Sequence, residues 1–231
     1  MSISKKELIN GIRKDLYLPD SDPEINESLV AQQKTFRLKT DLLSDRNKNN
    51  HISLYDQYIS DFNRISAELD TANRDAAVSN TSDFRSLKID ETYNMNAAYL
   101  HELYFNNISD LSSQIVMDSL SYIRLSRDFG TFDEWQKDFI ACCTASRCGW
   151  AITYFNTYTQ RYMNCSIDFH SLNVPVGSYP VIVMDVWQHA YYSDYLKDVK
   201  TYIYGMMKQL NWKVIENRIK KSEKIATVIK G

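Results

Sequence analysis

The sequence predicts an α+β protein, in which an N-terminal antiparallel α-helical hairpin is followed by a C-terminal α/β domain with a three-stranded antiparallel sheet. Three observations lead to this expectation. Apolar residues recur at helical intervals in two long segments of the first half, a polar segment separates these two, and three strand-like runs follow in the second half. A helical half followed by a mixed half is the layout of the α+β class.

The first predicted helix lies within residues 39–69, and the second runs from about residue 90 to residue 108. One face of the first carries Leu54, Tyr58, Phe62, Ile65 and Leu69, and one face of the second carries Tyr93, Ala97, Leu100, Tyr104 and Ile108. Residues 70–83 are rich in Asn, Ser, Thr and Asp and read as a loop. Two long amphipathic helices joined by a loop favour an antiparallel hairpin.

The second half begins with a helix-start signal. Thr131 and Glu134 have the spacing of a capping box, which predicts a helix from there to about Thr144. Strands are expected at residues 150–155, 163–169 and 181–186, where β-branched and aromatic residues lie between turn residues. Helix is expected again over residues 191–210, and a last one over 211–221.

We expect four parts along the chain: an extension or docking arm (1–36), the helical hairpin domain (37–115), the α/β domain (116–222) and a C-terminal tail (223–231). Within the arm, residues 5–18 could form a short helix, because Pro19 and Pro23 with polar residues between them would end it. The arm could dock on a partner, or it could be a poorly ordered tail.

Composition and charge indicate which partners and which cellular compartment to expect. The formal net charge of −2 gives no reason to expect nucleic acid or an anionic membrane as a partner. No apolar run approaches the ~18 residues of a membrane span, and no hydrophobic segment follows Lys5 and Lys6 as it would in a secretory signal. The four cysteines, Cys142, Cys143, Cys148 and Cys165, are too irregular for a disulfide framework. Their spacing also matches no recognised zinc site, so reduced thiols in a cytoplasmic protein are the simpler expectation.

The octapeptide Asp185-Val186-Trp187-Gln188-His189-Ala190-Tyr191-Tyr192 is the most informative stretch of the chain. It places a carboxylate and an imidazole four positions apart, and the two can close on one metal ion if the backbone turns between them. This mixed ligand set suits a redox-active first-row metal. The octapeptide closely resembles the D-V-W-E-H-A-Y-Y signature of the iron/manganese superoxide dismutase family.

Further blocks in the same order strengthen the resemblance. They are Leu43-Ser44 eight residues before His51, the segment 58–63, the segment 96–105 around His101, Asp128-Phe129-Gly130-Thr131-Phe132, Gly149-Trp150-Ala151 and Asn211-Trp212. Each is similar to a family element, and together they cover roughly residues 37–220. The four histidines of the chain, His51, His101, His170 and His189, all fall at positions where the family needs an imidazole or a polar neighbour of the metal.

The resemblance implies a metal site and an activity. The ligands would be His51, His101, Asp185 and His189, holding one iron or manganese ion per chain. The implied activity is disproportionation of superoxide to oxygen and hydrogen peroxide, since iron and manganese can take and return one electron whereas zinc cannot. A homodimer or a higher oligomer is expected.

The resemblance also implies the surroundings of the metal. Tyr58 resembles the gateway tyrosine that relays protons, and His170 stands where most members carry a glutamine that donates to solvent at the ion. The metal site would be lined by three aromatic side chains that exclude water: Phe105, Trp150 and Trp187. Gln188 and Tyr192 complete the expected pocket.

Three departures from the family pattern motivate a rival hypothesis. Gln188 replaces a glutamate that reaches across the family dimer to the partner's metal histidine. Leu54 and Tyr55 stand where further histidines are usual, and His51 lies seven residues before Tyr58 where most members have eight. Either a helical irregularity is lost or one alignment is wrong by one position.

The rival hypothesis is a weakly active or inactive structural or interaction subunit of a larger assembly, such as a viral particle. A hydrolytic metalloprotein is disfavoured, because no H-E-x-x-H pattern supplies a general base.

Overall fold

The structure, a computed structural model, describes residues 31–108 and 113–230 of the 231-residue chain. The chain divides into two units, residues 1–31 and residues 32–231. The helices and strands described here all belong to the second unit. The short helix expected over residues 5–18 lies outside the described residues, as does most of the expected arm.

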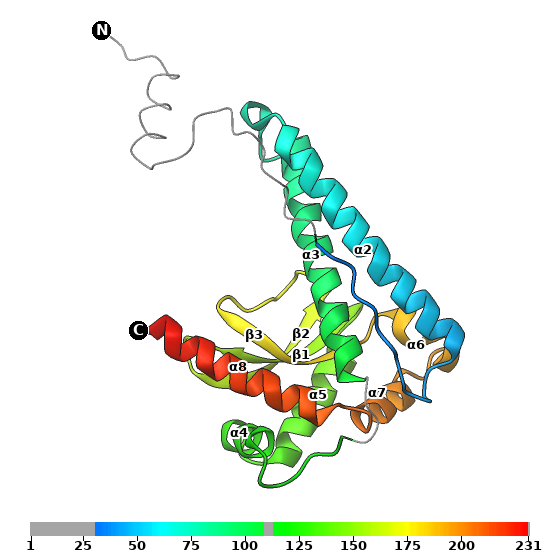
Figure 1. Cartoon of the computed structure of the whole chain (residues 1–231), viewed down its shortest axis with the longest axis vertical. Helices are drawn as coiled ribbons and strands as arrows, with labels where there is room; N and C mark the ends of the chain where they lie inside the picture. Colours follow the sequence, from blue (N-terminus) through cyan, green and yellow to red (C-terminus); the bar gives the residue numbers. More distant parts are fainter. Residues whose placement is uncertain (1–30, 109–112, 231) are drawn as a thin grey trace. The chain divides into compact units, whose positions relative to one another are not determined.

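The first half of this unit is a pair of long helices (Figure 1). Helix α2 (Asp45–Thr71) and helix α3 (Asp83–Asn107) are joined by a loop that holds the 3₁₀ turn η1 (Arg74–Ala76), and they run side by side in opposite directions. Each helix begins at a serine N-cap, since the hydroxyls of Ser44 and Ser82 accept hydrogen bonds from backbone N–H groups of their first turns. The hairpin expected from the apolar periodicity is confirmed.

The buried face of α2 differs from the expected stripe at its N-terminal end. His51, Tyr55 and Ile59 are buried there, whereas Leu54 and Tyr58 are partly exposed. Hydropathy alone misplaces this face, because a polar side chain lies inside it and the neighbouring apolar residues lie at its edge. In α3 the expected stripe is buried from Ala97 onward.

The second half is built around a three-stranded antiparallel sheet. It contains β1 (Gly149–Asn156), β2 (Arg161–Asp168) and β3 (Ser178–Asp185), with β1 in the centre. Every residue of β1 is buried. The strand begins at a glycine for a steric reason: a Cβ at Gly149 would lie 1.9 Å from the carbonyl oxygen of Ile167 on β2.

Five helices accompany the sheet: α4 (Leu120–Phe129), α5 (Phe132–Ala145), α6 (Gln188–Tyr195), α7 (Val199–Met207) and α8 (Trp212–Lys230). Half of the predicted capping box of α5 is present, since the Thr131 hydroxyl accepts from the backbone N–H of Glu134, whereas the Glu134 carboxylate accepts from Lys137. The single helix expected over residues 191–210 is two helices. Leu196 takes a left-handed conformation with φ 52°, and the Asp198 carboxylate caps the start of α7. Helix α8 is longer than expected and continues past Lys221.

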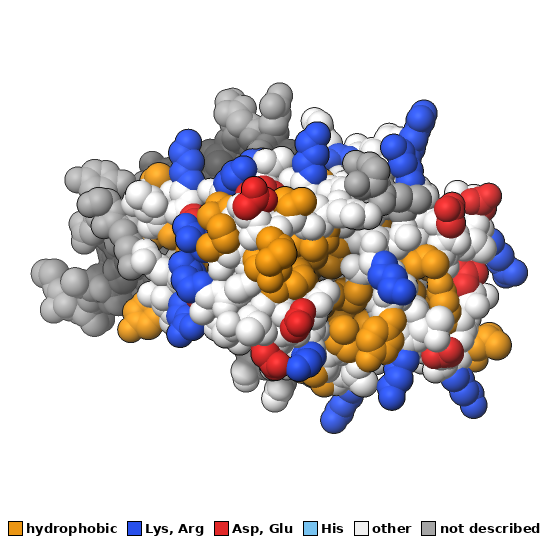
Figure 2. Space-filling view, turned by 90° about the horizontal axis from the view of Figure 1, so that it is seen from below, with side chains coloured by type: hydrophobic (Ala, Val, Ile, Leu, Met, Phe, Trp, Pro, Cys, Tyr) orange, Lys and Arg blue, Asp and Glu red, His pale blue; other side chains and the backbone are white. Residues whose placement is uncertain are grey.

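Helices α3 and α8 contact β3, while α5 contacts β1 and β2, so the sheet lies within the helical elements (Figure 1). The predicted α+β class, with a helical hairpin before a three-stranded sheet, is therefore confirmed. Seen from below, basic, acidic and apolar side chains are interspersed over one face of the molecule (Figure 2). Within residues 31–108 and 113–230, no helix has both the length and the apolar character that crossing a membrane requires.

Candidate metal centre

Four separate elements each contribute one predicted ligand to a single cluster. His51 comes from α2, His101 from α3, Asp185 from the end of β3 and His189 from the first turn of α6. One donor atom from each side chain lies within 4.8 Å of all the others. The first three side chains are fully buried and His189 is partly exposed. The sequence-predicted ligand set is brought together completely.

The three imidazoles converge on one carboxylate oxygen. Oδ2 of Asp185 lies 3.1 Å from Nε2 of His51, 3.2 Å from Nε2 of His189 and 3.7 Å from Nε2 of His101. All three rings therefore present the same nitrogen toward the same point. Three imidazole nitrogens and one carboxylate oxygen suit a first-row transition metal.

Backbone hydrogen bonds hold Asp185 in its place. Its second carboxylate oxygen, Oδ1, accepts from the backbone N–H of Trp187 at 2.8 Å. Its carbonyl oxygen accepts from the hydroxyl of Tyr202 at 2.7 Å, and that hydroxyl also lies 2.9 Å from the hydroxyl of Tyr104. The turn that leads from β3 into α6 therefore fixes the carboxylate and brings His189 beside it.

The tautomer of His101 follows from its neighbour. Its Nδ1 lies 2.6 Å from the carbonyl oxygen of Ala97. A carbonyl can only accept, so Nδ1 carries the hydrogen and Nε2 keeps its lone pair. Nε2 is buried and has no hydrogen-bond partner among the described residues. A buried lone pair aimed at the cluster is what a metal ligand requires.

Burial and charge set the protonation of the ligands. Burial lowers the pKa of His51, and it holds the pKa of His101 well below its usual range, so both rings are neutral at pH 7. Burial alone would raise the pKa of Asp185, but His189 and His51 beside it bring that pKa well below its usual range. Neutral imidazoles and an ionised carboxylate are the forms that bind a cation, so the residues present fit an iron or manganese ion.

Tyr58, His170 and Trp150 form a hydrogen-bonded chain beside the cluster. The indole N–H of Trp150 donates to Nδ1 of His170 at 3.0 Å, and Nε2 of His170 lies 3.2 Å from the hydroxyl of Tyr58. The ring of Tyr58 lies 5.3 Å from that of His101, between centroids. Burial lowers the pKa of His170 to about 4 and raises that of Tyr58.

Aromatic rings line the remaining sides. Phe105 lies 5.0 Å from His51, Trp150 lies 4.9 Å from His101, and Trp187 lies 5.7 Å from His189, between ring centroids. These rings limit the access of water to the cluster. The other two predicted pocket residues, Gln188 and Tyr192, are exposed on α6.

The spacing between His51 and Tyr58 is explained by the helix itself. Helix α2 is an uninterrupted α-helix over this stretch, and seven residues make about two turns of 3.6 residues each. Both side chains therefore reach the site from one face of a regular helix. Tyr55, one turn after His51, donates instead to Oε1 of Glu102 at 3.0 Å.

Sequence reasoning missed two tyrosines and one asparagine that belong to the surroundings of the cluster. Tyr93 lies 4.6 Å from His170 and Tyr104 lies 5.4 Å from His51, between ring centroids. Both were expected only as core residues, because a tyrosine on an apolar stripe carries no signal of what it faces. Asn47, one helical turn before His51, is buried at 1% exposure. The sequence around Asn47 is polar and gave no sign of this burial.

Comparison with known proteins gives the same assignment. Residues 121–218 match the family described as iron/manganese superoxide dismutases, C-terminal domain. Iron superoxide dismutases of Aquifex aeolicus and Aquifex pyrophilus are each 32% identical over 179 residues, which cover 76% of this chain and 83% of theirs. A manganese superoxide dismutase of Halobacterium salinarum is 28% identical over 123 residues, 53% of this chain and 60% of its own. With this similarity and the assembled cluster of three histidines and one aspartate, the chain belongs to the iron/manganese superoxide dismutase family.

Proposed function

We propose that the protein is a superoxide dismutase that uses one iron or manganese ion held by His51, His101, Asp185 and His189. The observation that carries the proposal is the convergence of four donor atoms from four elements to within 4.8 Å. In the reaction, two superoxide anions and two protons give one oxygen and one hydrogen peroxide. When bound, the ion supplies the one-electron chemistry of both halves. Three neutral imidazoles and one carboxylate leave the loaded site positive, which favours an anionic substrate.

Tyr58 is proposed as the residue that delivers protons, with His170 orienting it. The indole of Trp150 can only donate, so Nδ1 of His170 is the acceptor. Because burial lowers the pKa of His170 to about 4, the ring is neutral at pH 7 and its hydrogen is on Nε2. That Nε2–H donates to the Tyr58 oxygen, so the hydroxyl hydrogen of Tyr58 points away from His170 and can be passed on.

The environment of Tyr58 supports this role. Burial raises the pKa of its hydroxyl, so the group stays protonated at neutral pH. Tyr58 also hydrogen-bonds Tyr93, whose pKa is raised by burial. Tyr93 is partly exposed, so it offers a path by which solvent restores the proton that Tyr58 gives up. The aromatic walls of Phe105, Trp150 and Trp187 keep other water from the site.

A homodimer through the face that carries α6 is proposed as the assembly. Tyr192 on α6 and Leu196 directly after α6 are exposed, and so are Phe169 and Leu172 after β2. The rings of Phe169 and Trp187 lie 6.0 Å apart, so Phe169 adjoins the aromatic rings around the cluster. Light scattering should give twice the chain mass, and a Tyr192→Arg variant that stays dimeric would exclude this face.

The arm, residues 1–36, remains a proposed docking segment for a partner.

The cytoplasm is proposed as the compartment. Cys142, Cys143, Cys148 and Cys165 are all free thiols in the structure. Burial raises the pKa of Cys143 and brings that of Cys165 to about 11, which makes both weak nucleophiles at neutral pH. Thiols of this kind suit a reducing environment. Placement within a virion belongs to the rival hypothesis of a structural subunit.

The test compares purified wild type with His101→Ala after reconstitution with iron or manganese. Wild type should bind one ion per chain and remove superoxide, and the variant should lose more than about 100-fold of the activity, because it lacks a ligand. Asn94→Ala is the control: Asn94 is also buried on α3, but its amide donates to the carbonyl of Asp90 in its own helix. A wild type that binds no metal and forms defined oligomers would favour the structural rival. Full activity in His101→Ala would exclude this site.

A further inference from the structure

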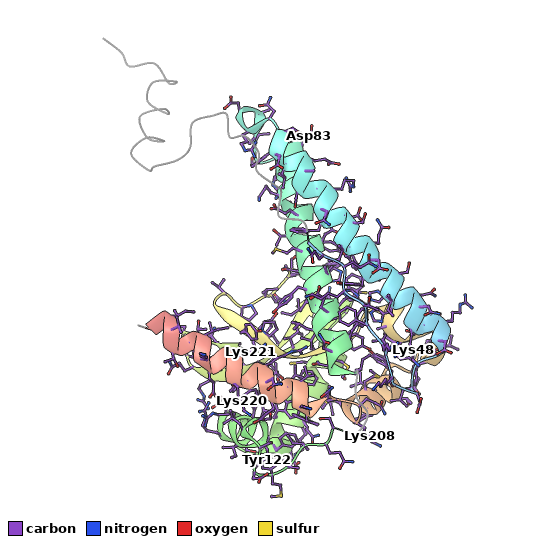
Figure 3. All side chains as sticks on the ribbon, viewed as in Figure 1. Lys48, Asp83, Tyr122, Lys208, Lys220 and Lys221 are labelled. Carbon is purple, nitrogen blue, oxygen red and sulfur yellow. The ribbon has the colours of Figure 1, made fainter. Side chains whose placement is uncertain are left out.

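Three hydrogen-bonded links join the start of α2 to α6, and we call them the α2–α6 clasp. The Tyr195 hydroxyl donates to the carbonyl oxygen of Leu42 at 2.7 Å, and the backbone N–H of Ser44 donates to Oδ2 of Asp194 at 2.9 Å. The third link is the side chain of Asn47. Lys48, labelled in Figure 3, marks this end of α2, which lies next to α6 in Figure 1. The clasp connects segments about 150 residues apart in sequence.

Asn47 lies close in the chain to His51 and bonds the residue that follows His189. Its Nδ2 donates to the carbonyl oxygen of Ala190 at 3.1 Å and to the hydroxyl of Ser193 at 3.0 Å. Ala190 directly follows His189, and His51 lies one helical turn after Asn47 on the same face of α2. The Ala190 carbonyl can only accept, so it fixes which end of the Asn47 amide is the nitrogen. The other end of the amide, Oδ1, is then the acceptor of this side chain.

Two buried polar atoms near the start of α2 lack a hydrogen-bond partner within the described part of the chain. Oδ1 of Asn47 and Nδ1 of His51 are both buried and without a hydrogen-bond partner among the described residues. If Nε2 of His51 binds an ion, Nδ1 must carry the hydrogen, and a buried N–H without an acceptor is costly. For His101 the acceptor is the Ala97 carbonyl one turn earlier. The corresponding position before His51 is Asn47, which offers an acceptor that lacks a donor.

We propose that Asn47 is a positioning residue of the metal centre. Its Nδ2 holds α6 and thereby His189, and in the metal-loaded protein its Oδ1 becomes the acceptor of the Nδ1–H of His51, a bond that is not made in this structure. One side chain then sets the tautomer and orientation of one ligand and the location of a second. Neighbours of this kind change metal affinity by about 10- to 100-fold when they are removed. The inference rests on the proposed function, because it requires that the four-residue cluster holds an ion.

The test measures metal affinity in three variants of the full chain. Asn47→Leu keeps a similar volume but removes both the acceptor and the donors. Ser193→Ala removes one link to α6 and leaves Oδ1 in place, and Asn94→Leu changes a buried asparagine that bonds within its own helix. Competition with a chelator for Mn²⁺ gives the dissociation constants, and thermal unfolding of the metal-free proteins reports general destabilisation.

Asn47→Leu should bind Mn²⁺ about 10- to 100-fold more weakly than wild type, while Ser193→Ala and Asn94→Leu stay within about 3-fold. Equal affinity in Asn47→Leu would overturn the inference, as would an equal loss in Asn94→Leu. A wild type that binds no ion would overturn the metal centre itself, which is a distinguishable result.

A second measurement uses wild type alone, in case Asn47→Leu does not fold. Nitrogen-15 NMR of the zinc-loaded protein, in which diamagnetic zinc can take the same ligands, should show a slowly exchanging hydrogen on Nδ1 of His51 with a nuclear Overhauser contact to Asn47. A His51 ring that carries its hydrogen on Nε2, or a rapidly exchanging Nδ1–H, would contradict the proposal.

Discussion

At the scale of single residues, the ligands were predictable and their supports were not. His51, His101, Asp185 and His189 lie in blocks with a chemical pattern, and the structure places their donor atoms together. The contacts of Asn47 with α6 and of Tyr93 with His170 join separate elements of the fold. No local spacing encodes such contacts, so only the folded chain reveals them.

The spacing of His51 and Tyr58 is a particular case. The sequence left two explanations open, a lost helical irregularity or an alignment error of one position. A regular α2 brings both side chains to the site, because seven residues return to nearly the same face. The apparent departure therefore does not remove Tyr58 from the cluster.

Replacing Tyr58 by phenylalanine tests the proton path. Tyr58→Phe should retain the ion and the fold but lose about 100-fold in superoxide turnover, because the hydroxyl that His170 orients is gone. The rate of superoxide decay after pulse radiolysis measures the loss. Tyr122→Phe is the matched control. Tyr122 lies on α4 (Figure 3), and its ring stacks on that of Phe132 in α5. Wild-type turnover in a metal-loaded Tyr58→Phe would remove Tyr58 from the mechanism.

At the scale of elements, helix starts were partly visible in the sequence. The Thr131 cap of α5 was predicted from a spacing of three residues and is found in the structure. The start of α4 is different, because Glu216 on α8 joins the cap. Its carboxylate accepts from the backbone N–H of Leu120 at 3.2 Å and of Ser121 at 2.8 Å, and from the Ser121 hydroxyl. This partner lies 95 residues away from Ser121, beyond the reach of a local pattern.

This long-range cap predicts a dependence of stability on pH. Burial would raise the pKa of Glu216, but its hydrogen bonds from Ser121 and Leu120 outweigh burial and lower it. A carboxylate with a lowered folded pKa stabilises the fold above its unfolded pKa, and that contribution is lost as the pH falls through the folded pKa. Glu216→Gln should therefore be less stable than wild type at pH 7 by about 1 kcal/mol, with the difference closing in acid.

Urea unfolding of both proteins at pH 7 and near pH 3 measures this difference. Glu68→Gln is a control, because Glu68 pairs with Arg64 on the exposed side of α2. A gap between wild type and Glu216→Gln that is the same at both pH values would show that the charge of Glu216 does not matter.

At the scale of the whole molecule, the order of elements was predictable but the sheet order was not. Three short strand-like runs with turns between them favour antiparallel pairing. They do not say which strand is central, and the structure places β1 between β2 and β3. The position of β3 matters for function, because its last residue is Asp185 and the turn after it leads to His189 on α6. The ligands meet because α3 of the hairpin contacts β3 and α2 contacts α6.

X-ray diffraction from crystals of the metal-loaded protein, recorded on both sides of the iron and manganese absorption edges, tests the central claim most directly. A single anomalous peak per chain is predicted, within bonding distance of about 2.0–2.2 Å of Nε2 of the three histidines and of Oδ2 of Asp185. A peak elsewhere, or ligand side chains that turn away from one another in crystals shown to contain the metal, would contradict it.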